Sequence, residues 1–81
     1  MTLAELLKEW RRSHFMSQKD LARKLGVAWG TVQRWEASKG LPFPAMQRLL
    51  VEELKIPPEE LRAALDASEA EMAGNGGKVA A

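Results

Sequence analysis

Hydrogen-bonding and cationic side chains concentrate between residues 18 and 39, on either side of a Trp29-Gly30 pair. Arginine and glutamine present two hydrogen-bonding groups side by side, and lysine presents a positive charge. A large flat ring beside a backbone without a side chain suits close contact with another surface. These residue types favour binding of an anionic or acceptor-rich partner, and the candidate residues are Gln18, Lys19, Thr31, Gln33, Arg34 and Lys39.

Charge is distributed unevenly along the chain. Residues 1–39 carry eight Lys or Arg and four Asp or Glu, a net charge of +4. Residues 40–81 carry four Lys or Arg and seven Asp or Glu, a net charge of −3. Such asymmetry is compatible with an anionic partner for the first half. By charge alone, however, an ordinary solvated surface is the simpler explanation.

Several function classes find no support in the composition. The chain has no cysteine and only one histidine, His14, so neither a disulfide framework nor a Cys/His metal site is expected. We find no nucleophile with a neighbouring base and no phosphate-binding loop, and therefore expect no enzyme activity and no cofactor. No apolar run reaches the roughly 20 residues of a membrane span, and the start does not resemble a signal peptide. We expect a cytoplasmic protein with no membrane partner.

Two helices are predicted ahead of the Trp29-Gly30 pair. Residues 17–25 form a short helix, with Ser17 as its N-cap and Asp20 in its first turn. Gly26 follows at the position where a left-handed residue commonly ends a helix. The earlier helix covers residues 2–12, and its apolar stripe consists of Leu3, Leu6, Leu7 and Trp10.

A third helix is predicted over residues 28–37. If Val32 and Trp35 face inward, a rotation of about 100° per residue turns Trp29, Gly30, Gln33 and Arg34 outward. Two short helices joined by a tight glycine turn form a helix-turn-helix unit over residues 17–37.

The remainder of the chain predicts two further helices and a tail. Pro44 and Pro58 suit the first turns of these helices. Apolar density falls after residue 66, so we expect residues 67–81 to form a flexible C-terminal tail. Because no segment has the pattern of a strand, the fold expected for residues 1–66 is an all-α, compact five-helix domain.

The stretch "SQKDLARKLGVAWGTVQRWEASKGLP" resembles the helix-turn-helix of the phage-repressor family, the Cro and lambda-repressor-like proteins. Ala22 is the small residue that lets the two helices approach, and Gly26 makes the turn. The segment "TVQRWE" is similar to the family's "TVSRWE", and Lys39 and Pro42 match the "K…P" that follows it. The motif's five apolar positions carry Leu21, Leu25, Val27, Val32 and Trp35.

This resemblance implies a transcription regulator that binds double-stranded DNA, located on the nucleoid when bound. The helix at residues 28–37 would enter the major groove, and the protein would act as a homodimer on a pseudo-palindromic site. Base reading would fall to Trp29, Gly30, Gln33 and Arg34, and phosphate contacts to Gln18, Lys19, Thr31 and Lys39.

Other interpretations remain open at this point. Trp29 could pack against a neighbouring helix or a second copy of the chain, and Gly30 could be a neutral surface residue. The whole unit could instead be a helix-turn-helix module for a protein partner, as in an antitoxin.

Two positions raise structural expectations. Glu36 is expected to be structural and paired with a nearby arginine. The family often has glycine where this chain has Ser38, so we expect Gly40 to take the special backbone role after the third helix.

Overall fold

Five helices make up the part of the chain that the structure describes. The computed structural model describes residues 1–80, with side chains described for residues 1–73. The helices are α1 (Leu3–Ser13), α2 (Gln18–Leu25), α3 (Trp29–Glu36), α4 (Pro44–Leu54) and α5 (Pro58–Ala80). Residues 1–80 contain no strand, so the prediction of an all-α fold with five helices is confirmed.

The first two helices begin at reciprocal capping boxes. In α1, Thr2 Oγ1 accepts from the amide of Glu5, whose carboxylate accepts from the amide of Thr2. Ser17 and Asp20 make the same exchange at the start of α2. Each box satisfies amides that a helix start would otherwise leave without partners. Because these contacts join residues that are close in the chain, the starts of α1 and α2 could be predicted from the sequence.

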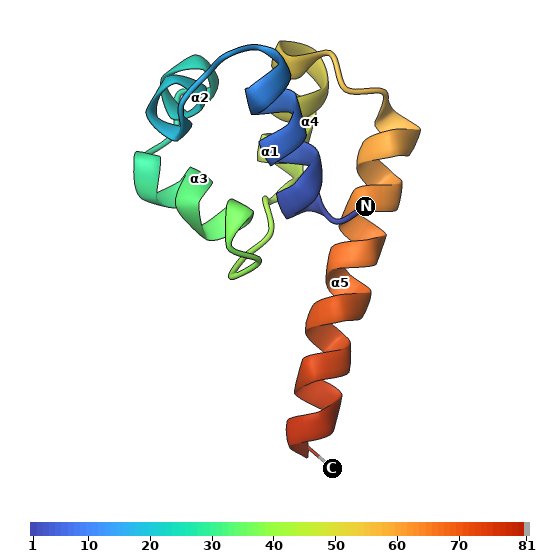
Figure 1. The fold of residues 1–81 in the computed structure, drawn as a ribbon. Coiled ribbons are helices and arrows are strands. Elements are labelled where there is room, and N and C mark those ends of the chain that lie inside the picture. Colours follow the sequence, from blue (N-terminus) through green and yellow to red (C-terminus); the bar gives the residue numbers. More distant parts are fainter. Residues whose placement is uncertain (81) are drawn as a thin grey trace.

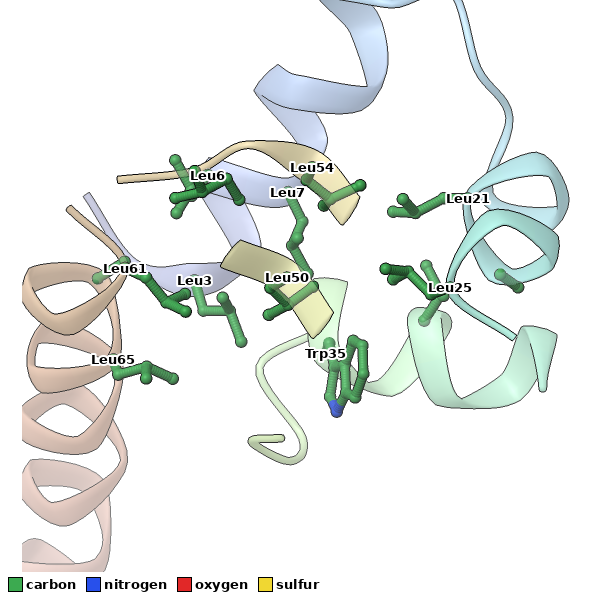
Figure 2. Close-up of a cluster of buried hydrophobic side chains, with 14 residues drawn as sticks. Leu3, Leu6, Leu7, Leu21, Leu25, Trp35, Leu50, Leu54, Leu61 and Leu65 are labelled. Carbon is green, nitrogen blue, oxygen red and sulfur yellow. The ribbon is translucent and has the colours of Figure 1, made fainter. Parts of the chain in front are cut away.

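The helices enclose one apolar core, in which α1 and α4 lie between the α2–α3 pair and α5 (Figure 1). Side chains from all five helices converge there, with Leu7 and Leu50 near the centre and Trp35 pointing in from α3 (Figure 2). Trp10 packs at the edge of this core, and its Nε1 donates to the carbonyl of Leu54 over 2.8 Å. The core therefore holds α2 and α3 firmly against the rest of the domain.

Helix α5 continues beyond the boundary that the sequence placed at residue 66. Ser68 is buried, and its Oγ accepts from the amide of Leu3 over 2.8 Å. A polar residue thus satisfies one of the unpaired amides at the start of α1, and the folded unit includes at least Ser68. A fall in apolar density cannot reveal such a contact. The flexibility expected of residues 67–81 stays a prediction, and Ala81 lies outside the described residues.

Helix α5 extends away from the body of the domain, while the N-terminus lies beside its upper part (Figure 1). None of the helices in the described part of the chain combines the length and the apolar character needed to cross a membrane.

Candidate nucleic-acid interface

Helices α2 and α3 are joined by a turn that depends on Gly26. Its φ of 72° lies in the left-handed region, which is unfavourable for residues that carry a side chain. The turn closes through two hydrogen bonds, from Gly26 N to Arg23 O and from Val27 N to Ala22 O. This pattern is a Schellman motif, which ends α2 and directs the chain into α3.

Helix α3 buries one face and exposes the other. Val32, Trp35 and Glu36 are buried, while the side of the helix with Gln33 and Arg34 is exposed. The outward orientation expected for the four predicted base readers is therefore observed, although Trp29 is partly covered at 44% exposure.

The predicted site residues fall into two groups. One group surrounds a shallow depression of about 560 Å³ on the outer side of α3, lined by Ala28, Gly30, Thr31, Gln33, Arg34, Ala37 and Lys39. The other group lies where α2 begins and comprises Gln18, Lys19 and Trp29. Trp29 Nε1 donates to Gln18 Oε1 over 3.4 Å, and Lys19 Nζ lies 4.5 Å from the centre of the indole ring. The Trp29 side chain thus contacts α2 and does not line the depression.

Arg34 is held at the edge of the depression by the loop after α3. Its Nη2 donates to the carbonyl of Lys39 over 3.0 Å. The guanidinium lies over Gly40, where an added Cβ would come within 3.3 Å of Nη2. Gly40 therefore provides room for this arrangement, and the other guanidinium N–H groups of Arg34 remain for a partner.

The special backbone role after α3 belongs to Ser38, so the expectation that Gly40 would take it is wrong. Ser38 has φ 58°. Ser38 N donates to Trp35 O and Lys39 N donates to Arg34 O, which is again a Schellman motif. These two hydrogen bonds and the packing of the buried face of α3 fix the backbone, even though serine is strained there. The same motif ends α1, with Phe15 at φ 54°.

A partly buried ion pair joins α3 to α1. Glu36 accepts from Arg11 Nε and Nη2, each over 2.9 Å, and from Gln18 Nε2 over 3.1 Å. The hydrogen bonds to Glu36 raise the pKa of Arg11. The structural role expected for Glu36 is confirmed, and its partner is Arg11. Sequence reasoning missed Arg11 because this residue lies off the apolar stripe of α1.

The start of α2 is held by hydrogen bonds, although most of its residues are exposed. The capping box uses the amide of Asp20, and its hydrogen bonds lower the pKa of the Asp20 carboxyl. Gln18 is half-buried between Glu36 and Trp29, while Lys19 is exposed. In the described part of the chain, no group of His, Cys, Asp or Glu is arranged to hold a metal ion.

Comparison with protein-family models adds one finding to this geometry. A model described as a helix-turn-helix domain matches residues 2–72. Comparison with curated proteins and with solved structures gives no match.

Proposed function

The chain belongs to the helix-turn-helix domain family, and from this premise we propose that it is a sequence-specific regulator of transcription that binds double-stranded DNA. In this proposal the protein is of the phage-repressor type, and α3 enters the major groove. B-DNA accommodates an α-helix in that groove, where each base pair presents a distinct set of hydrogen-bonding groups.

The observation that carries this proposal is the exposed polar face of α3. Gln33 and Arg34 lie on it beside the bare backbone of Gly30. Arg34 is suited to a bidentate pair with guanine O6 and N7, and Gln33 to adenine N6 and N7. Gly30 lets the helix approach the groove closely, because it has no side chain to keep the surfaces apart.

Residues at both ends of this face are proposed to contact the DNA backbone. Gln18 and Lys19 lie at the start of α2, where the helix dipole favours an anion. Thr31 and Lys39 line the same depression as Gln33 and Arg34. Contacts of this kind set the register of a protein on DNA but carry no sequence information.

A single unit of this size makes few contacts, so we propose that two copies bind together as a homodimer. Two-fold symmetry would place their α3 helices in successive major grooves, about 34 Å apart. Helix α5 is the proposed dimer surface, because its acidic residues would avoid DNA.

Selection of binding sites from a random pool of duplex DNA, at low and at physiological salt, tests this function. We expect enrichment of an inverted repeat at both salt concentrations. Binding that disappears with salt and enriches no sequence would contradict the proposal, since it would indicate phosphate contact alone. A helix-turn-helix module for a protein partner, such as an antitoxin, would then be the better explanation.

A further inference from the structure

Trp29 contacts two adjacent side chains of α2 with different parts of its ring. The indole edge donates through Nε1 to Gln18 Oε1 over 3.4 Å. The indole face lies under the ammonium group of Lys19, whose Nζ is 4.5 Å from the ring centre. This distance suits a cation–π interaction. One residue of α3 thereby restrains both of the proposed phosphate-binding side chains at the start of α2.

The contacts of Gln18 also fix which way its amide faces. Gln18 Nε2 donates to Glu36 Oε1 over 3.1 Å, and a carboxylate can only accept. The indole N–H of Trp29 can only donate. Both partners therefore require the same orientation of the Gln18 amide, with Nε2 toward Glu36 and Oε1 toward Trp29. One Nε2 hydrogen is then left to donate to an acceptor such as a phosphate oxygen.

We propose that Trp29 is a positioning residue for phosphate binding by Gln18 and Lys19 and that it does not read base edges. This inference rests on the proposed function. It replaces the base-reading role that the sequence predicted for Trp29, and it leaves the reading of bases to Gln33 and Arg34, which lie farther along the same exposed side of α3. Because phosphate contacts carry no sequence information, loss of Trp29 should weaken binding to every duplex by a similar factor.

Two substitutions separate the two contacts of the ring. Trp29→Phe keeps an aromatic face for Lys19 but removes the N–H that holds Gln18. Trp29→Ala removes both contacts. Since Trp29 is 44% exposed and lies outside the apolar core, both variants should fold, which circular dichroism would verify. Arg34→Ala serves as the matched control, because it changes a proposed base reader on the same helix.

The test compares the dissociation constants of an enriched duplex and of a scrambled duplex with the same composition. For Trp29→Ala we expect both complexes to weaken about three- to tenfold, with the ratio of the two constants unchanged. Trp29→Phe should weaken both complexes by a smaller factor. In a Gln18→Ala background, Trp29→Phe should cause almost no further loss, because its partner is already absent.

Two results would overturn the inference. A ratio that falls toward one in Trp29→Ala would mean that Trp29 reads bases. Full additivity of Trp29→Phe and Gln18→Ala would mean that the two residues are not coupled. A different result would contradict the proposed function. Wild-type protein that binds both duplexes equally would lack sequence specificity, but the affinities of the Trp29 variants for either duplex would still test the positioning role. Wild-type protein that binds neither duplex would contradict both.

Discussion

Arg11 and Glu36 join α1 to α3 through two hydrogen bonds of 2.9 Å between the guanidinium and the carboxylate. The Glu36 side chain is 2% exposed and the Arg11 side chain 18% exposed. Removal of one member of such a pair leaves the other charge without a partner in a poorly solvated place. The pair therefore sets the position of α3 relative to the body of the domain.

Glu36→Ala should lower the free energy of unfolding by about 3 kcal/mol, because it removes the partner of Arg11 and a hydrogen bond of Gln18. Urea unfolding followed by circular dichroism measures this change. Arg12→Ala is the control, since Arg12 is exposed next to Arg11 on α1 and should change stability by less than about 0.5 kcal/mol. Equal effects of the two variants would show that the ion pair contributes no stability.

Phe15→Gly should raise the free energy of unfolding by about 0.5–1 kcal/mol. Phe15 is 95% exposed at a positive φ, where a side chain is strained and glycine is not. Phe15→Ala retains the Cβ and should give a smaller gain. The comparison is a pair of urea unfolding curves, and a larger gain from alanine than from glycine would rule out backbone strain at this position.

Gly30→Ala should separate stability from DNA binding. A Cβ at Gly30 meets nothing within 4 Å in the free protein, and alanine favours a helix over glycine by about 1 kcal/mol. The variant should therefore be more stable by about that amount. Its affinity for DNA should fall, because the added methyl group lies on the face proposed to approach the groove. Unchanged affinity in a titration with the enriched duplex would show that DNA does not closely approach Gly30.

The capping boxes predict how stability depends on pH. Hydrogen bonds from the backbone and side chain of Ser17 lower the pKa of Asp20, and those of Thr2 lower the pKa of Glu5. A carboxyl whose pKa is lowered by folding stabilises the protein above its unfolded pKa, and this contribution is lost as the pH falls through the folded pKa. NMR titration of the two carboxyl carbons should give values below the usual ranges. Values at or above those ranges would mean that the boxes do not form in solution.

Local signals in the sequence predicted the elements of the fold better than the contacts between them. Ser17 and Gly26 marked α2 correctly because caps and turns depend on adjacent residues. The sequence wrongly predicted that Gly40 would adopt the special backbone conformation after α3. Ser38 adopts it instead, because the hydrogen bonds of the Schellman motif offset the strain of its positive φ. The contact of Ser68 with the start of α1 could not be predicted, because its partner Leu3 is distant in the chain.

The sequence predicted only part of the candidate site, because periodicity within one helix does not reveal contacts with another helix. Helical periodicity placed Gln33 and Arg34 on the exposed face of α3 correctly. It could not place the Trp29 ring, because the direction of that side chain is set by contacts with Gln18 and Lys19 on another helix. The sequence did not identify Arg11 as the partner of Glu36, because an ion pair between two helices produces no periodic pattern in the sequence.

The most direct test of sequence-specific binding through α3 is the ratio of dissociation constants for an enriched and a scrambled duplex at physiological salt, measured for the wild type and Arg34→Ala. We expect the wild type to prefer the enriched duplex by about a thousandfold or more. We expect Arg34→Ala, with unchanged helix content, to lose about 1–3 kcal/mol of that preference. A wild-type ratio near one would contradict sequence-specific binding, and an unchanged ratio in Arg34→Ala would contradict base reading by that residue of α3.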